Sequence, residues 1–324
     1  MHSAVSPKVN PPVVVGIDGS RTHLATTDLA VAEAVRRSAP LLIVHVWPGR
    51  YAGSWRPHGS VQAVADGQHL LDVAARRAEH VAPGVQIETD LATGSPAQIL
   101  VHHSEQAQLV VVGHRDAVPT QPSWGSTTAY LAHHGRCPLL VHRSSVPPQG
   151  PVVLAVSGRL SSATTACAFE EAAMSGGRLV AVYVWTRPDD RADTRLTAAA
   201  GHVAERQQAE RHLAEALAGC TRDYPDVAVE RLALHDLDVA YTLERASRRG
   251  RLLIAGMGSN GRFAELLYGS PGLTLVRQAV CPVLLVPSDW RHQAAGTSHA
   301  ADAIDEAGGH PTGGRSRMPA RPSS

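Results

Sequence analysis

A glycine-rich segment in the second half of the chain is the clearest candidate for chemistry. It reads GMGSNGRFAELLYGS, runs from Gly256 to Ser270, and follows the apolar run RLLIA. Glycine loses more conformational freedom on folding than any other residue, so such a cluster requires a reason. A glycine-rich turn that leads into a helix presents backbone N–H groups and the positive end of the helix dipole, which suits a phosphate. We therefore take Gly256, Gly258, Gly269 and Ser270 as candidate phosphate-binding residues, with a plain turn and helix start as the alternative.

The chain repeats itself. The segment PPVVVGIDGS at 11–20 is echoed by GPVVLAVSGR at 150–159, and three further pairs of apolar segments follow in the same order. Two tandem copies of one domain explain this arrangement better than chance. The expected parts are a disordered start at 1–10, domains at 11–144 and 151–288, a Pro- and Ser-rich linker at 145–150, and a disordered tail at 289–324.

Within each copy, apolar strands alternate with helical segments. In the first copy, VVVGI, LLIVHVW and QLVVVG are short apolar runs, typical of strands buried on both faces. The helix after the first strand is expected to bury Leu24, Val31 and Val35. A later helix is expected to begin at Ser95 with a capping box and a proline, and its counterpart in the second copy at Asp238. This alternation predicts an α/β fold with two doubly wound parallel sheets of five strands each.

In such sheets, ligands bind beyond the carboxyl ends of the strands, where the strand order reverses. In the first copy this brings together the loops that follow Asp18, residues 46–48 and Gly113. Asp18 is expected to accept hydrogen bonds from a ligand, with an N-cap or Asx turn as the alternative. For Gly113, Gly125 and Ser126, a turn followed by a helix start is the preferred interpretation.

Several other classes of site are excluded by the sequence. The formal net charge of +1 gives no bulk attraction to nucleic acid or an anionic membrane, and no apolar run is long enough to cross a bilayer. The only lysine is Lys8, so a P-loop is excluded, and neither a Gly-x-Ser-x-Gly elbow nor a zinc-site spacing occurs. The histidine pairs at 102–103 and 133–134 point apart on a helix, so no metal is expected. Cys137 and Cys281 are expected to be buried at strand starts, and the absence of CxxC pairs favours reduced thiols in the cytoplasm.

The segments VVVGIDGS, LLIVHVW, GSPAQIL and GMGSNGRFAELLYGS, with two last strands that begin Cys-Pro, resemble the universal stress protein family in its tandem form. The resemblance covers residues 13–286. It implies an adenine-nucleotide α-hydrolase-like sheet in the order 3-2-1-4-5, self-association or an intramolecular pseudo-dimer through the last strands, and a role in stress or dormancy. ATP-binding members carry Gly-x2-Gly-x9-Gly-Ser/Thr after the fourth strand, an aspartate after the first, and an adenine contact from the backbone at the end of the second. The resemblance thus implies that Val46 and Val184 contact the base.

Each copy departs from that pattern. The second copy has Ser259 at the middle glycine and Ser157 in place of the aspartate, whereas the first has Asp116 at the middle glycine. A carboxylate among phosphate donors adds repulsion. We therefore expect a regulatory protein, not an enzyme, that binds ATP or AMP in one or both copies. A nucleotide-free interaction module of the same fold is the alternative, and a slow ATPase is a third.

Overall fold

Apolar strands form the centre of the structure, which is a computed structural model. It describes residues 10–47, 61–114, 126–143, 150–156, 161–185, 198–236, 239–257 and 279–290. These residues belong to one compact unit, Met1–Arg291. The elements of the first repeat are β1 (Val13–Ile17), α1 (His23–Arg36), β2 (Leu41–Trp47), α2 (Val61–Val81), β3 (Ile87–Thr93), α3 (Pro96–Ser104), β4 (Leu109–Gly113), α4 (Ser126–His134) and β5 (Leu139–His142). Those of the second are β6 (Val152–Val156), α5 (Ser162–Met174), β7 (Arg178–Trp185), α6 (Ala198–Asp223), β8 (Ala228–His235), α7 (Val239–Ser247), β9 (Leu252–Met257) and β10 (Val283–Pro287).

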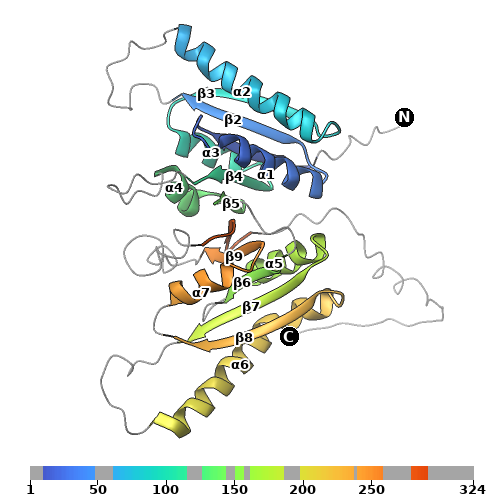
Figure 1. Cartoon of the computed structure of the whole chain (residues 1–324), viewed down its shortest axis with the longest axis vertical. Helices are drawn as coiled ribbons and strands as arrows, with labels where there is room; N and C mark the ends of the chain where they lie inside the picture. The colour runs from blue at the N-terminus through green and yellow to red at the C-terminus, as the bar shows by residue number, and fades with distance from the viewer. Residues whose placement is uncertain are drawn as a thin grey trace, which may run out of the picture. The chain divides into compact units, whose positions relative to one another are not determined.

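The strands form one ten-stranded sheet in the order β3-β2-β1-β4-β5-β10-β9-β6-β7-β8 (Figure 1). Within each repeat all neighbouring strands are parallel, and the order is that of strands 3-2-1-4-5. The expected α/β fold with parallel sheets is therefore confirmed. The structure adds that the two five-stranded sheets join through β5 and β10, which pair antiparallel.

The pairing of β5 with β10 places a local two-fold axis at the seam between the repeats. Leu140 lies opposite Leu284, and the two residues occupy the same position in the segments CPLLV and CPVLL. A residue that pairs with its own repeat equivalent marks the axis relating two copies. The repeats therefore meet through equivalent surfaces, as two subunits of a symmetric dimer do.

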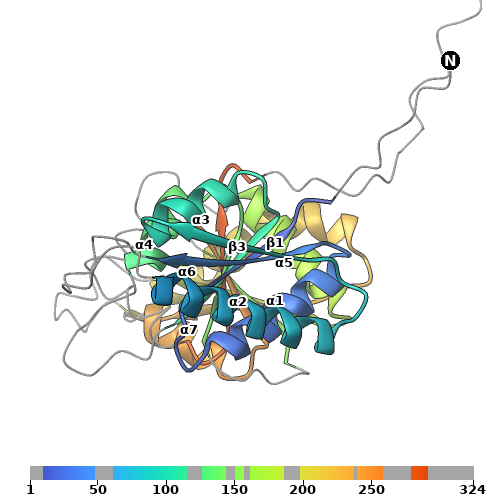
Figure 2. The same cartoon turned by 90° about the horizontal axis from the view of Figure 1, so that it is seen from above.

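The helices cover both faces of the sheet, as a doubly wound fold requires. One buried cluster contains apolar residues of α1, α2, α5 and α6, and a second cluster on the opposite face contains residues of α3, α4 and α7. Figure 2 shows α1 and α2 of the first repeat on one side of its strands, with α3 and α4 on the other. The strands contribute alternate residues to the two clusters, which explains their continuous apolar sequences.

Two local predictions about helices were wrong. Val31 of α1 is buried but Val35 is 52% exposed, and the helix instead buries Ala30, Glu33 and Ala34. Ala30 and Ala34 belong to the buried cluster against the sheet, whereas the Glu33 carboxylate pairs with Arg36 and Arg37. Ser95 precedes α3, with a proline at the first turn as expected, but its side chain makes no capping hydrogen bond. Asp238 lies outside the described residues.

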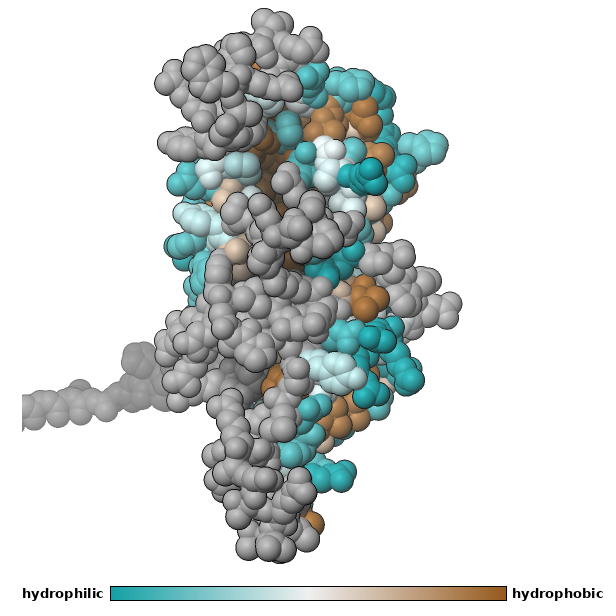
Figure 3. Space-filling view, turned by 60° about the vertical axis from the view of Figure 1, so that its left-hand side comes forward, coloured by the Kyte–Doolittle hydropathy of each residue, from teal (hydrophilic) through white to brown (hydrophobic). Residues whose placement is uncertain are grey.

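Cys137 and Cys281 are buried beside the seam, as predicted, and all four cysteines of the chain are free thiols. Among the described residues, no helix has the length and apolar character needed to span a membrane. On the face shown in Figure 3, the described residues alternate between hydrophilic stretches and smaller apolar patches. That mixed character is ordinary for the surface of a folded domain.

Candidate functional site

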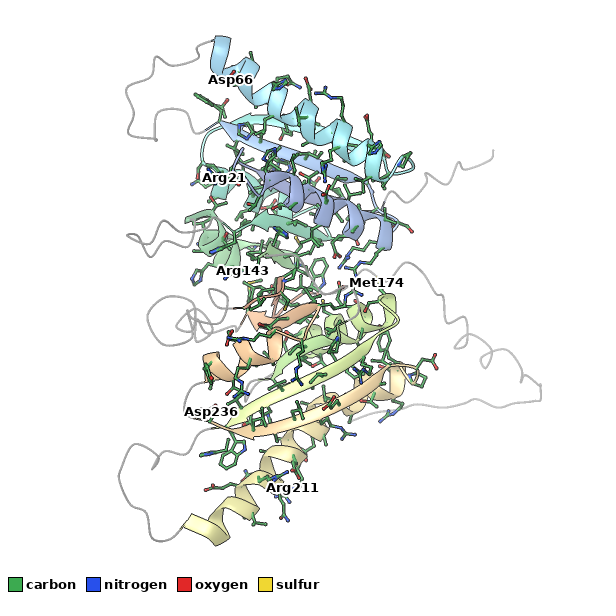
Figure 4. All side chains as sticks on the ribbon, in the orientation of Figure 1. Arg21, Asp66, Arg143, Met174, Arg211 and Asp236 are labelled. Carbon is green, nitrogen blue, oxygen red and sulfur yellow. The ribbon has the colours of Figure 1, made fainter. Side chains whose placement is uncertain are left out.

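The turn between β1 and α1 holds Asp18 at the carboxyl edge of the sheet. Asp18 is exposed, and its Oδ1 accepts a hydrogen bond of 3.0 Å from the backbone N–H of Ser20. Gly19 between them has a φ of 70°, a left-handed conformation that glycine adopts without strain. The Asx turn that the sequence analysis gave as the alternative to ligand binding is therefore present. It fixes the carboxylate beside the edge, with Arg21 exposed in the same loop (Figure 4).

Val46 presents its backbone at the same edge. The carbonyl oxygen of Trp47 accepts a hydrogen bond of 2.9 Å from Gly94 N, on the β3 side of β2. Successive carbonyl groups of a strand point to opposite neighbours, so the Val46 carbonyl points toward β1. β1 ends at Ile17, which lies opposite His45. The Val46 carbonyl is thus an acceptor beyond the end of β1, beside the Asp18 turn.

Gly113, at the end of β4, lies against the first turn of α1. A Cβ atom at this position would lie 2.9 Å from Oγ1 of Thr26 and 3.5 Å from Oγ1 of Thr22. The first distance is shorter than an ordinary contact, so a larger residue would require the Thr26 side chain, or the helix that carries it, to shift. Close packing against α1 therefore gives this glycine a structural role, which differs from the turn and helix start expected from the sequence.

A hydrogen-bonded chain beneath Gly113 ties α1 to β5. The Thr26 hydroxyl donates to the Thr22 carbonyl at 3.0 Å, and His142 Nδ1 lies 3.3 Å from the Thr26 oxygen. Because the Thr26 proton is already donated, His142 Nδ1–H acts as the donor. Burial lowers the pKa of His142, and the charge of Asp28 opposes that shift only in part. His142 is therefore a neutral donor that positions the start of α1.

Thr26, His45 and His142 were not predicted as site residues from the sequence. His45 Nδ1 donates to the carbonyl oxygen of Ile17 at 2.9 Å, which secures the end of β1. The sequence offered one signal, the pair Thr26-Thr27, because threonine is a weak helix former and needs a reason inside a helix. The structure shows that both threonines are buried. These three residues hold the strand and helix ends that form the edge of the site.

The second repeat copies part of this arrangement. A Cβ at Gly256, on β9, would lie 2.7 Å from Oγ1 of Thr164 on α5, so this glycine also allows a helix to approach closely. The N-cap of α5 is Ser161, whose Oγ accepts from Thr164 N at 3.1 Å. The carbonyl of Trp185 accepts from Asp236 N at 3.3 Å, so Val184 directs its carbonyl toward β6, as Val46 does toward β1. The residue that would match Asp18 is Ser157, outside the described residues.

The structure therefore brings together Asp18, Val46 and Gly113 in the first repeat, and Val184 and Gly256 in the second. α4 begins at Ser126, as predicted, although the side chain of this residue is not described. The candidate phosphate-binding residues Gly125, Gly258, Gly269 and Ser270 lie outside the described residues.

The histidine pairs of the first repeat do not form a metal site. His103 Nε2 lies 3.0 Å from Asp90 Oδ2, and His102 Nδ1 lies 3.6 Å from Glu105 Oε2. No group of three or more metal-ligating side chains is found within the described part of the chain. His102 and His103 thus each lie beside a separate carboxylate, whereas the ring of His134 lies against Tyr130.

A family model and the sequences of known proteins both match this chain over most of its length. The model of the Universal stress protein family matches residues 10–143 and 150–287. The universal stress protein Rv2005c of Mycobacterium tuberculosis is 30% identical over 294 residues, which cover 84% of this chain and 96% of that protein. A universal stress protein of Mycolicibacterium smegmatis is 29% identical over 291 residues, covering 85% and 96%.

A solved structure of a universal stress protein has the same fold. The crystal structure of a universal stress protein from Archaeoglobus fulgidus has a TM-score of 0.63 at 15% identity and covers 85% of this chain and 96% of its own. A shorter universal stress protein, solved in complex with cAMP, is 26% identical, has a TM-score of 0.34, and covers 41% of this chain and 97% of its own. The family model matches the chain twice, and the alignments with the relatives cover nearly the whole length of those proteins. The chain therefore belongs to the universal stress protein family.

Proposed function

We propose that the first repeat binds an adenine nucleotide, ATP or AMP, and that the protein acts as a cytoplasmic regulator in stress or dormancy without useful turnover. The observation that carries this proposal is the convergence of Asp18, the Val46 carbonyl and the end of β4 at one edge of the sheet. In a doubly wound fold this edge is where ligands bind. The second repeat offers a similar edge and lacks the aspartate, so it is the weaker candidate.

Each group has a role that suits its chemistry. The Val46 carbonyl accepts a hydrogen bond from the exocyclic amino group of adenine, and the Asp18 carboxylate accepts from a ribose hydroxyl. The phosphates lie toward the start of α4, where the backbone N–H groups of the first helical turn and the helix dipole favour an anion. The sequence contains neither of the catalytic motifs considered above, the P-loop and the Gly-x-Ser-x-Gly elbow. We therefore propose binding and not hydrolysis.

Isothermal titration of the full-length protein with ATP and AMP tests the proposal. We expect Asp18→Ala to weaken binding at least about tenfold, because it removes a charged hydrogen-bond acceptor. The matched control is Asp28→Ala, which removes the same charge from the α1 surface, where Asp28 pairs with Arg77 at 2.6 Å. Equal affinity of the two variants, or no heat with the wild type, would contradict the proposal and favour the nucleotide-free interaction module. Phosphate release that is lost in Asp18→Ala would instead indicate the slow ATPase.

A further inference from the structure

Four charged side chains meet at the seam between the repeats, where α1 approaches α5. Arg37, the C-cap of α1, forms ion pairs with both Glu33 of that helix and Glu171 of α5. Arg36 also pairs with both carboxylates, and its Nη1 lies 3.3 Å from Oε2 of Glu171. We call these four residues the seam quartet.

The seam quartet is withdrawn from water. The side chains of Glu33 and Glu171 are 6% and 2% exposed, and that of Arg37 is 12% exposed. Burial raises the pKa of Glu171 even though Arg37 attracts its charge. Burial also opposes the charge of Arg37, but the carboxylates of Glu171 and Glu33 outweigh it and raise the pKa of the guanidinium. A buried carboxylate of this kind depends on its cations.

The quartet is not symmetric, although the seam is. The segments AVAEAVRR at 30–37 and AFEEAAMS at 168–175 align so that Glu33 corresponds to Glu171. Arg36 and Arg37 correspond to Met174 and Ser175, which are neutral (Met174 is labelled in Figure 4). Both cations therefore come from the first repeat, and the second repeat brings a carboxylate without them.

This asymmetry gives each possible pairing a different charge. A first repeat against a second repeat joins two glutamates with two arginines and is neutral. Two first repeats would join four arginines with two glutamates, a surplus of two positive charges. Two second repeats would bury two glutamates with neither arginine. Like charges placed together at an interface suppress the wrong partner.

We propose that the seam quartet selects pairing of a first repeat with a second repeat and disfavours like-with-like pairing across the same strands. The surface is the β5–α1 face of the first repeat, and its partner is the β10–α5 face of the second, in this chain or in another copy.

Two further arginines lie near the seam. Arg251, beside β9, is within electrostatic range of Arg36, Glu33 and Glu171, and burial followed by the charge of Arg36 lowers its pKa. Arg251 makes no ion pair with either carboxylate among the described residues, so it does not replace Arg37. Arg143 follows β5 and donates from Nε to the Ala279 carbonyl at 3.1 Å, a contact between the repeats.

The test uses the full-length protein with a specific protease site placed between residues 144 and 149, cut after folding. Native mass spectrometry then separates like and unlike pairs by mass. For the nicked wild type we expect unlike pairs only. Arg37→Ser should weaken the unlike pair roughly 100-fold or more, because it leaves a buried carboxylate short of a cation. Ser175→Arg should permit pairs of two second repeats, since one arginine then accompanies each Glu171.

The double variant Arg37→Ser/Ser175→Arg separates charge selection from a general packing defect. It moves one cation to the other repeat, keeps the quartet neutral, and should restore the unlike pair. Val203→Arg, at a position that is 60% exposed on α6, is the matched control for the added charge and should form no like pairs. The proposal is overturned if the nicked wild type forms like pairs as readily as unlike ones, if it forms no unlike pair, or if the double variant is no tighter than Arg37→Ser.

Discussion

The close approach of Gly113 to α1 gives a prediction with a calculable size. A Cβ atom at residue 113 would lie 2.9 Å from Thr26 Oγ1, about 0.5 Å inside an ordinary contact. Overpacking of this kind costs about 1–3 kcal/mol, so Gly113→Ala should lower the free energy of unfolding by that amount. Thr26→Ala removes the opposing oxygen. The double variant should therefore be less destabilised than the sum of the two single variants, by about the same 1–3 kcal/mol.

Urea denaturation of the four proteins in this cycle measures the coupling. Gly84→Ala is the control, because an added Cβ there meets no atom within 4 Å. If Gly113→Ala costs no more than Gly84→Ala, or if Thr26→Ala gives no relief, the packing explanation for Gly113 is refuted. A nucleotide titration of Gly113→Ala/Thr26→Ala completes the experiment. Retained binding would show that this glycine serves the fold and not the ligand.

Three further outcomes are expected. Arg37→Met should lower the free energy of unfolding by about 3–5 kcal/mol because it leaves Glu171 buried with a missing partner, whereas Arg77→Met, at an exposed pair, should cost far less; equal losses in chemical denaturation would contradict this. Burial lowers the pKa of His142 below 6.5, so below that pH the unfolded state binds more protons. The wild type should therefore lose stability relative to His142→Asn as the pH falls from neutral through 6.5, and parallel pH profiles would count against it. Cys220 should react first with a thiol reagent, as seen by mass spectrometry, because the other three cysteines are buried; earlier labelling of any of those would disprove the assigned burial.

The parallel sheets could be predicted because the strands are buried on both faces. Each strand then needs apolar residues on both sides, so runs such as VVVGI and LLIVHVW carry an unambiguous signal. The repetition of these runs in order also predicted that both copies share one topology. The strand order itself came from the family resemblance.

The exposed side of α1 could not be predicted, because a second repeat decides which side is buried. The buried carboxylate of Glu33 is stabilised by Arg36 and Arg37, which also pair with Glu171 of the second repeat. From the sequence, Val35 was the better candidate for the core, yet it faces solvent. Hydrophobic periodicity describes packing within one domain and carries no information about a polar contact between two.

The candidate site could be predicted only in part from the sequence. Asp18 follows β1 and Val46 is the last residue but one of β2, so the topology placed them at one edge. Gly113 and Gly256 match a ligand-binding spacing, but the structure also gives each of them a packing partner, Thr26 or Thr164. A spacing motif does not distinguish a glycine that admits a phosphate from one that admits a helix.

Backbone amide shifts measured by NMR during titration with AMP test the central claim most directly. We expect the largest changes at residues 17–21, 46–47 and 113–114, and no change on the surface of α2 and α6. Saturable shifts centred on any other part of the molecule, or no shifts at millimolar AMP, would contradict it.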